Sequence, residues 1–389
     1  MGKYDFDSLP NRKGTSSLKW DVKENELPMW VADMDFFVAP EIRSFLMKKV
    51  NEGVYGYSDL PASWAKAYSA YYDEKYGLMF DESNLTFSLG VIPSVSSAVR
   101  AFTEKGEKVA VFTPNYHVFY HSITNNERII APIELLDSGN SYSIDWEALE
   151  NVFKEKDVTM FIMSNPHNPS GKIFSKEELE KIAILADRYG VFVLSDEIHG
   201  EITEPGYSYV PYFLSSPLAK KNSLTCLSPT KAWNMAGIQT SAVLSFDREV
   251  TKKIRFSLNK DEVMEGNFFS YGAAITAYSE GKGWLREMNE YVAENRRIVL
   301  KAMEEKMPLL KPYPSHSTYL LWVNFGALKG DGKGFVRFLR EKTGLFLSDG
   351  VEFSPSTSNF FRMNLATSKS NIEDAMRRLA VGIDLFETK

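Results

Sequence analysis

Apolar runs and helical patterns alternate through the middle of the chain. Apolar runs begin near residues 85, 108, 158 and 190, and each is followed by polar or turn-forming residues. Ser175 and Glu178 have the spacing of a capping box, which predicts the start of a helix at that point. Strands that alternate with helices predict an open, mostly parallel α/β sheet with its ligand at the carboxyl ends of the strands.

The last third of the chain has a different pattern. Residues 247–305 are helical and highly charged, and beyond about 315 short apolar runs alternate with helical segments. This second pattern predicts a smaller α+β unit. We expect three segments: an N-terminal arm with part of the small domain at 1–45, a large ligand-binding domain at 46–285, and a small C-terminal domain at 286–389.

The N-terminal region carries an apolar run that contains acids. Residues 27–36, LPMWVADMDF, predict an extended segment interrupted by Asp33 and Asp35. The two acids suit either the caps and turns of an N-terminal arm or a loop that packs over a site. Two helices are expected beyond this run, on either side of the glycine-hinged aromatic loop Gly53–Tyr57.

Composition narrows the class of protein. The chain has 389 residues, of which 44% are hydrophobic, so it can bury a large core. A net charge of -6 and a pI near 5.6 argue against a nucleic-acid surface or an anionic membrane, and no apolar run has the length of a membrane-spanning helix. The single cysteine, Cys226, excludes an intrachain disulfide, and the first residues lack the apolar core of a signal peptide. We expect a cytoplasmic protein that binds small molecules.

The histidines do not predict a metal site. Of the five, only His117 and His121 have the i,i+4 spacing of neighbours on a helix, and no Glu or Cys accompanies them as in common zinc sites. They are expected to be packing residues.

Lys231 is the central candidate for chemistry. It lies in LSPTKAWNMAG, among small, hydroxyl-bearing and apolar residues, where an ammonium loses solvation and its pKa falls. A neutral lysine amine can form a Schiff base. Ser228, three residues earlier, could hold an anion such as the phosphate of a bound cofactor. Viewed alone, Lys231 could equally be a solvated loop residue.

Other candidates follow the predicted strands. Asp196 could pair with a protonated ring nitrogen or cap a helix, and Asn165 could bond to a phenolic oxygen or serve in a turn. Tyr116 could stack on a planar ring or pack in the core. Arg362 could clamp a substrate carboxylate or form an ordinary salt bridge. The turn at Gly90 joins a strand to a helix, which presents free backbone N–H groups to an anion.

Three motifs, in this order and spacing, resemble those of a known family. SNPHNPSG, SDEIHGE and SPTKAWNMAG are similar to the motifs of fold type I pyridoxal-phosphate enzymes in the class I/II aminotransferase superfamily. Within it, LPMWVADMDF, GVYGY and DEIH resemble the cystathionine β-lyase-like branch of carbon–sulfur lyases, the MalY/PatB type. The resemblance covers almost the whole chain and implies a large domain with a mostly parallel sheet and a smaller α+β domain.

The resemblance also implies the cofactor, pyridoxal 5'-phosphate, and roles for individual residues. Lys231 would bond to the cofactor aldehyde and then act as a base, Asp196 would pair with the pyridine nitrogen, and Asn165 would bond to the phenolic oxygen and contact substrate. Tyr116 and His199 would contact the cofactor ring, and Ser228 would bind the phosphate together with the N–H groups of Val91 and Ile92. Arg362 would bind the substrate carboxylate. The resemblance also implies a homodimer in which Tyr57 of the second subunit makes a catalytic and substrate contact.

Two positions depart from the general aminotransferase pattern. His199 stands where a tyrosine is often found, and Gln239 stands where an arginine commonly follows the lysine. Both favour the lyase branch, so β-elimination of L-cystathionine or a related S-substituted cysteine to a thiol, pyruvate and ammonia is the preferred hypothesis. A pyridoxal-phosphate-dependent aminotransferase is the alternative, and a cofactor-binding regulatory protein that acts through a protein partner is an alternative of another class.

Overall fold

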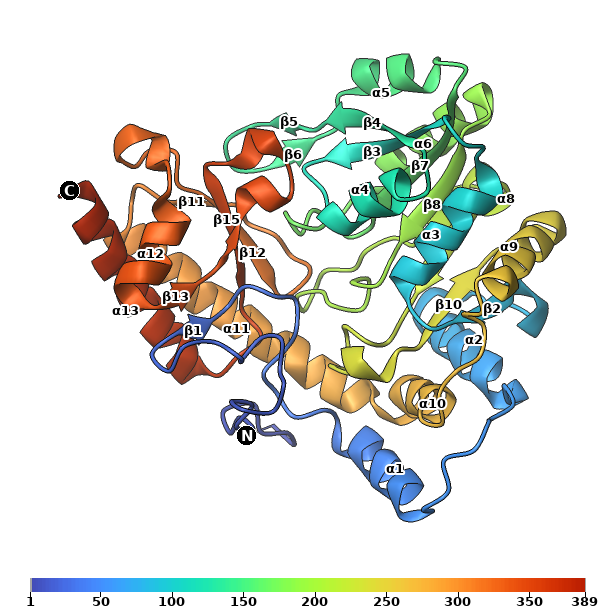
Figure 1. Cartoon of the computed structure of the whole chain (residues 1–389), viewed down its shortest axis with the longest axis horizontal. Coiled ribbons are helices and arrows are strands. Elements are labelled where there is room, and N and C mark those ends of the chain that lie inside the picture. The colour runs from blue at the N-terminus through green and yellow to red at the C-terminus, as the bar shows by residue number, and fades with distance from the viewer. Residues whose placement is uncertain (1, 389) are drawn as a thin grey trace.

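The structure is a computed structural model that describes residues 2–388, and its largest element is a seven-stranded sheet (Figure 1). In order across the sheet, the strands are β2 (Leu85–Ser88), β10 (Ser241–Leu244), β9 (Ser223–Leu227), β8 (Phe192–Asp196), β7 (Val158–Ser164), β3 (Lys108–Thr113) and β4 (Ile129–Glu134). Only β10 runs antiparallel to its neighbours. The prediction of a mostly parallel sheet is confirmed.

The central strands are apolar on both faces because helices cover both. In β7, Met160 and Ile162 join one buried cluster, whereas Phe161 and Met163 join another. This alternation is the two-residue period of a strand, and a continuous apolar run is typical of a parallel strand buried on both sides. One cluster is closed by α3 (Val91–Phe102), α4 (His117–Thr124) and α9 (Arg248–Lys260). The other is closed by α5 (Trp146–Phe153), α6 (Lys176–Tyr189), α7 (Tyr212–Ser215) and α8 (Pro217–Lys221).

Local chemistry fixes the ends of α6. The Ser175 hydroxyl accepts from the Glu178 backbone N–H, and the Glu178 carboxylate accepts from the Ser175 N–H, so the predicted capping box is confirmed. At the other end Gly190 has a φ of 71°, a left-handed conformation that glycine adopts without steric cost. These caps satisfy backbone groups that the first and last turns leave without partners.

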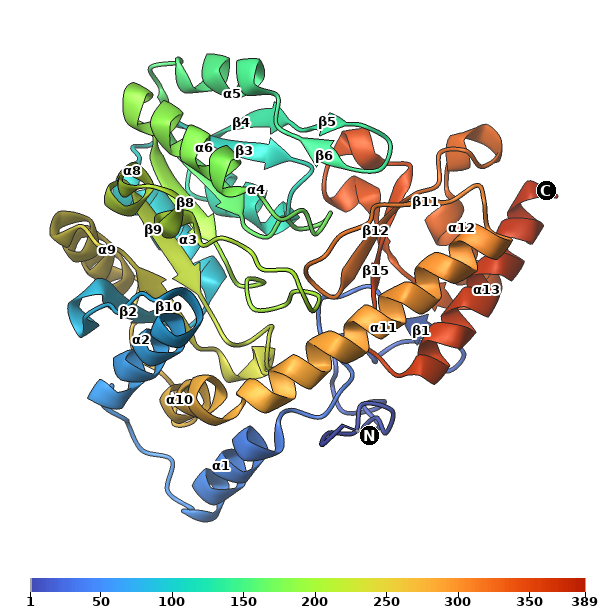
Figure 2. The same ribbon diagram turned by 180° about the vertical axis from the view of Figure 1, so that it is seen from behind.

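A second, four-stranded sheet follows the first along the chain. Its order is β11 (Lys311–Pro312), β12 (Leu320–Asn324), β15 (Phe360–Asn364) and β14 (Ser348–Asp349), with antiparallel pairing throughout. The long helix α11 (Lys282–Lys306) runs from beside α10 toward the small sheet and lies on the side that faces the viewer in Figure 2. The other helices of the C-terminal region are α12 (Phe335–Thr343) and α13 (Lys369–Glu387). This is the predicted smaller α+β unit.

The N-terminal region joins the C-terminal one through its first strand. β1 (Leu27–Pro28) pairs in parallel with β13 (Leu345–Phe346). The chain then continues into α1 (Pro40–Asn51) and α2 (Ala62–Tyr76), and α2 packs against α10 (Ser270–Glu280). A small hairpin, β5 (Leu136–Asp137) with β6 (Tyr142–Ser143), completes the strands. The division into segments at 45 and 285 stays a prediction.

The predicted extended run at 27–36 is only partly correct, since Leu27–Pro28 alone forms a strand. The rest has no ladder partner, because side chains from distant segments take its carbonyl groups, as described below. The helical region at 247–305 resolves into three helices, α9, α10 and α11.

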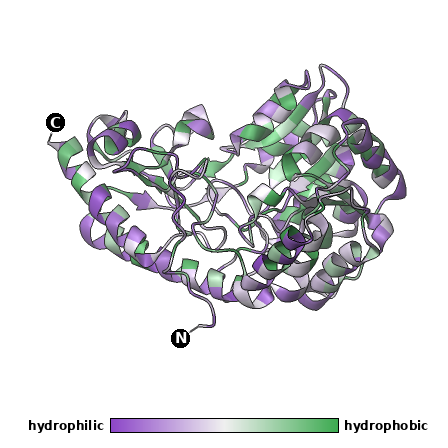
Figure 3. Cartoon of the chain, turned by 60° about the horizontal axis from the view of Figure 1, so that its bottom comes forward, coloured by the Kyte–Doolittle hydropathy of each residue, from purple (hydrophilic) through white to green (hydrophobic). Residues whose placement is uncertain are grey.

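Hydropathy follows the layers of the fold. Apolar residues concentrate on the strands of the large sheet, whereas the outer faces of the helices are largely hydrophilic (Figure 3). Within residues 2–388, no helix combines the length and the apolar character needed to cross a membrane.

Candidate active site

The register of the large sheet aligns the strand ends that carry the motifs. Ser164, Asp196 and Cys226 are paired across β7, β8 and β9, so the loops that follow these strands leave the same edge of the sheet. Lys231 lies in the loop beyond β9. Segments about thirty residues apart in sequence therefore meet at one edge, as expected for the ligand crevice of an open α/β sheet.

A cavity of ≈ 540 Å³ lies between this edge and the small sheet. Its volume is in the range of small-molecule sites. Seven of the predicted site residues line it: Lys231, Asp196, Tyr116, His199, Arg362, Val91 and Ile92. The lining that residues 2–388 provide does not include Asn165, Ser228 or Tyr57.

Lys231 lies in the wall of this cavity, largely shielded from solvent, and its pKa is lowered. Burial, together with the Arg362 charge, lowers its pKa to about 8, and the charges of Asp33 and Asp196 oppose this shift. Its Nζ donates to the backbone oxygen of Ala32. An amine with a depressed pKa is the form that attacks a carbonyl carbon.

Asp196 ends β8 and is held rigidly. Its Oδ1 accepts from the backbone N–H of Ile198 at 3.1 Å, and its own carbonyl accepts from the Asn165 N–H at 2.8 Å. Burial raises the pKa of Asp196 to about 7, against the effects of that hydrogen bond and of Lys231. A buried carboxyl with a raised pKa is stabilised by any cationic partner, such as a protonated ring nitrogen.

The start of α3 lies in the cavity wall. Gly90 is the N-cap, and Val91 and Ile92 are the first helical residues. Their N–H groups have no acceptor one turn earlier in the helix, and the helix dipole favours a negative charge there. Thr230 and Gln239 also line this cavity. The combination suits a phosphate group.

Ser228 supports this wall from behind. Its hydroxyl donates to the Thr240 carbonyl at 2.8 Å and lies 2.7 Å from the Thr230 hydroxyl. Ser228 therefore orients Thr230, and Thr230 is the hydroxyl that borders the cavity. In this loop the structure therefore places Thr230, and not the predicted Ser228, at the border of the cavity.

Two rings border the space beside Lys231 and Asp196. Tyr116 precedes α4, and its ring packs edge-on against Phe119 at 5.9 Å between centroids. The His199 ring packs edge-on against Tyr319 at 6.0 Å. Burial lowers the pKa of His199 to about 3, so its imidazole is neutral, and its Nδ1 has no hydrogen-bond partner in the described part of the chain.

Arg362 approaches from β15 of the small sheet. One terminal nitrogen donates to the Asn168 side-chain oxygen at 2.9 Å, and the other donates to the Trp30 carbonyl at 3.1 Å. Burial lowers the pKa of Arg362 to about 10. No group among residues 2–388 accepts a hydrogen bond from its buried Nε. A guanidinium held in one plane with a spare donor suits a carboxylate.

Asn168 lies in the cavity lining, whereas Asn165, the asparagine that the sequence predicted there, does not. The Asn165 amide donates to the Val210 carbonyl at 2.8 Å and faces Glu197 at 3.4 Å, on the far side of the lining. Asn168, from the same SNPHNPSG motif, lines the cavity beside Arg362. The likeness of the two NP pairs in this motif explains why composition alone could not distinguish them.

Tyr57 lies away from the cavity of its own chain. Its side chain is completely exposed, and Val54, Tyr55 and Leu60 of the same loop are also exposed. The loop between α1 and α2 has no regular structure.

A strap formed by residues 30–36 closes the cavity from the N-terminal side. Its backbone oxygens accept hydrogen bonds from distant side chains, which include Arg362 and Ser348 on Trp30, Asn364 on Val31, Lys231 and Tyr319 on Ala32, Lys19 on Asp33, and Asn234 on Phe36. Two of these donors, Lys231 and Arg362, are predicted site residues.

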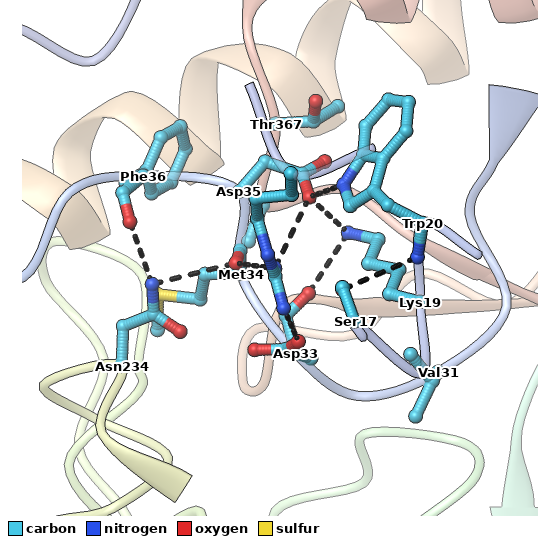
Figure 4. Close-up of polar contacts among 12 residues, drawn as sticks. Ser17, Lys19, Trp20, Val31, Asp33, Met34, Asp35, Phe36, Asn234 and Thr367 are labelled. Carbon is cyan, nitrogen blue, oxygen red and sulfur yellow. Dashed lines mark hydrogen bonds and ion pairs between the residues drawn. The ribbon is translucent and has the colours of Figure 1, made fainter. Parts of the chain in front are cut away.

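The two acids of the strap anchor it (Figure 4). Asp35 accepts from Lys19 at 2.9 Å and from the Trp20 ring N–H at 2.7 Å, and Asp33 pairs with Arg12 at 2.5 Å. The Lys19 side chain is 1% exposed, so this charge pair is shielded from solvent. Trp30, Val31 and Ala32 line the cavity, so this segment packs over the candidate site, as one of the two readings of the sequence expected.

Several residues of the cavity were not among the predicted site residues. His117 borders it, with a pKa lowered by burial and a buried Nδ1 that finds no partner in residues 2–388. Asn168 and Glu352 also line it. The NP repeat and the position of His117 next to Tyr116 were the available clues. No comparable clue pointed to Glu352, which lies after β14 of the small sheet and not after a strand of the large sheet.

Comparisons with known proteins agree with this geometry. A family model described as aminotransferase class I and II matches residues 33–379. The chain is 34% identical over 385 residues to cystathionine beta-lyase PatB of Bacillus subtilis strain 168, which covers 97% of this chain and 99% of that protein.

Solved structures share the fold over nearly the whole chain. Cystalysin from Treponema denticola, which contains pyridoxal 5'-phosphate, is similar with a TM-score of 0.94 and 31% identity, over 98% of this chain and 99% of that one. A PLP-bound candidate aminotransferase from Clostridium difficile 630 has a TM-score of 0.94 and 33% identity, over 98% of this chain and 100% of that one.

Proposed function

The chain belongs to the aminotransferase class I and II family, and from that premise we propose that it is a pyridoxal 5'-phosphate-dependent carbon–sulfur β-lyase. The reaction is α,β-elimination of L-cystathionine or a related S-substituted cysteine to a thiol, pyruvate and ammonia. One observation carries the proposal: Lys231, Asp196 and Arg362 converge in a single cavity, in a chain similar from end to end to a cystathionine β-lyase.

The residues of the cavity fit this cofactor. Lys231 provides an amine of lowered pKa for the aldehyde, Asp196 provides a buried carboxyl for the ring nitrogen, and the start of α3 provides N–H groups for the phosphate. We assign the contact with the phenolic oxygen to Asn168 in place of Asn165, because Asn168 borders the cavity.

Pyridoxal phosphate supplies the electron sink for a carbanion at the substrate Cα. Lys231 takes the α-proton, because a pKa of about 8 leaves a substantial fraction of neutral amine near neutral pH. The Cα–H and Cβ–S bonds break, a Cα–Cβ double bond forms, and the proton passes to the departing thiolate. Hydrolysis of the resulting enamine then gives pyruvate and ammonia.

Arg362 and the strap hold the substrate in place for this step. The Arg362 guanidinium binds the α-carboxylate, and Asn168 together with the Trp30 carbonyl fixes its plane. The strap and Tyr116 exclude water from the amine, which keeps the electrostatic effects inside the cavity strong.

An aminotransferase is the second candidate, favoured by the name of the family. A single incubation distinguishes the two reactions. A lyase releases pyruvate and free thiol from L-cystathionine without any keto acid, whereas keto-acid-dependent amino transfer without thiol release would refute the lyase proposal. Bound cofactor without turnover of any amino acid would favour a regulatory protein instead.

We further propose a homodimer in which Tyr57 reaches the cavity of the partner copy. The exposed apolar loop that carries Tyr57 supports this arrangement. Mixing a Tyr57→Ala variant with a Lys231→Ala variant, after dissociation and reassociation, should restore activity, since one site of each mixed dimer then has both native residues. If Tyr57 acts within its own chain, mixing restores nothing. A cytoplasmic location belongs to the same proposal and is tested by cell fractionation.

A further inference from the structure

A second cavity, of ≈ 440 Å³, lies apart from the active site. It is formed by α2, the start of α11 and the loop that follows β8, on the side of the molecule seen in Figure 2. Its lining mixes acids and bases, among them Glu201, Lys75 and Arg286. None of the roles proposed above uses these residues.

Two hydrogen-bond acceptors in this wall lack donors. Glu201 is 5% exposed, and its Oε2 accepts from Lys75 at 2.5 Å and from the Tyr71 hydroxyl. Its Oε1 is buried and receives no hydrogen bond from residues 2–388. The side-chain oxygen of Asn289 is in the same condition within the described chain, while the Asn289 amide donates to the Glu201 carbonyl at 3.0 Å. Buried acceptors are normally satisfied, so each of these two oxygens can take a hydrogen bond from an added N–H donor.

A cation on α11 provides the complementary group. Arg286 lies one turn before Asn289, lines the same cavity and makes no hydrogen bond or ion pair among residues 2–388. A guanidinium is suited to a carboxylate because its donors form a planar fork. The neighbouring Lys282 and Glu74 pair with each other at 2.5 Å, so they leave the local charge balanced.

We propose that this cavity is a second binding site for a small zwitterionic amino acid, whose ammonium group meets Glu201 and Asn289 and whose carboxylate meets Arg286. The cavity has the size of a small-ligand site. A cation alone would leave Arg286 unused, and an anion alone would leave the two acceptors unsatisfied. The zwitterion satisfies both ends.

The site adjoins the active site through one turn of the backbone. His199 lines the first cavity and Glu201 lines the second, and the Ile202 N–H donates to the His199 carbonyl at 3.0 Å. A ligand on Glu201 is thus two residues from a wall of the active site.

Equilibrium dialysis of the holoenzyme against radiolabelled glycine tests the proposal, since glycine has no β-substituent to eliminate. We expect two equivalents of glycine per chain for the native protein. Arg286→Gln and Asn289→Leu should each reduce this to one, and the visible spectrum of the bound cofactor should be unchanged. Arg286 is exposed, so its replacement does not disturb the core.

Two further variants complete the design. Arg297→Gln, an exposed arginine on the same helix that pairs with Glu294, should keep both equivalents. Arg362→Gln should lose the active-site equivalent and keep the other. A single equivalent in the native protein, removed by Arg362→Gln, would refute the second site and leave the proposed function intact. Two equivalents that survive Arg286→Gln would refute the assignment of these residues.

Discussion

The two walls of the active-site cavity are built on different principles. The edge of the large sheet presents the side chains of Asp196 and Lys231, and burial sets their pKa values. The strap at 30–36 presents mainly its backbone oxygens, and side chains from elsewhere hold it in place. We therefore expect proton transfer at the edge of the sheet, whereas the strap closes the cavity.

This difference separates chemistry from stability. A change at the edge should abolish turnover and leave the fold intact, because those charges are costly to bury and only function requires them. A change in the anchors of the strap should weaken the fold first, because it leaves a buried charge without its partner.

The largest expected effect comes from Lys231→Ala at the edge. Activity should fall at least about a thousandfold, within the range that a positioned proton-transfer group contributes, while the folded protein remains. The release of pyruvate from L-cystathionine measures the loss. Lys252→Ala, an exposed lysine on α9, is the matched control and should be fully active. Substantial activity in Lys231→Ala would contradict the proposal that the edge of the large sheet carries the chemistry and the strap does not.

The anchor of the strap gives the next largest effect. Lys19→Met should lower the free energy of unfolding by about 3 kcal/mol, because it leaves the buried Asp35 carboxylate without its closest cation. Urea unfolding measures the change.

The double variant Lys19→Met/Asp35→Leu provides the control for that result. With both charges gone, much of the stability should return, since a buried pair replaced by apolar groups is often neutral. Equal losses in the single and double variants would mean that packing, rather than charge pairing, secures the strap.

Arg362→Lys tests a residue that lines the cavity and also donates a hydrogen bond to the strap. Lysine keeps the charge but loses the planar fork, so kcat/KM should fall about 10- to 100-fold, the equivalent of one hydrogen bond to a charged group. The loss should fall mainly on KM, and steady-state kinetics separates it from kcat. An unchanged KM would contradict carboxylate binding by Arg362.

The smallest expected effect tests whether a charge in the strap changes the pKa of Lys231. The Asp33 charge raises the pKa of Lys231, so Asp33→Asn should move that pKa below about 8. Neutral amine increases as pH rises through the pKa, so the rate of pyridoxal phosphate attachment to cofactor-free protein should rise through pH about 8 in the native chain. In the variant this rise should occur at lower pH. A shift to higher pH would contradict the proposed influence of Asp33.

The sequence predicted the edge better than the strap, for a physical reason. Asp196 and Lys231 lie in short motifs directly after apolar strands, and parallel strands bring their carboxyl ends together. The partners of the strap are far away in sequence, as when Asn364 donates to the Val31 carbonyl. Hydrogen bonds to backbone oxygens require no particular residue in the strap, so the amino-acid sequence of the strap could not reveal these contacts.

The same reasoning applies to individual side chains. Asn165 and Asn168 each precede a proline in one motif, and only the path of the loop decides which faces the cavity. Ser228 and Thr230 are both hydroxyls near Lys231, and only the loop geometry brings Thr230 to the surface of the cavity. Sequence placed the segments correctly, whereas side-chain direction required the fold.

One measurement tests the central claim most directly. The holoenzyme is treated with borohydride, which fixes the cofactor to the amine that holds it, and the labelled peptide is then identified by mass spectrometry. The structure predicts a single labelled position, Lys231, because it is the buried lysine of lowered pKa in the cavity with Asp196 and Arg362. A label on any other lysine, or no label in protein that contains the cofactor, would contradict the account.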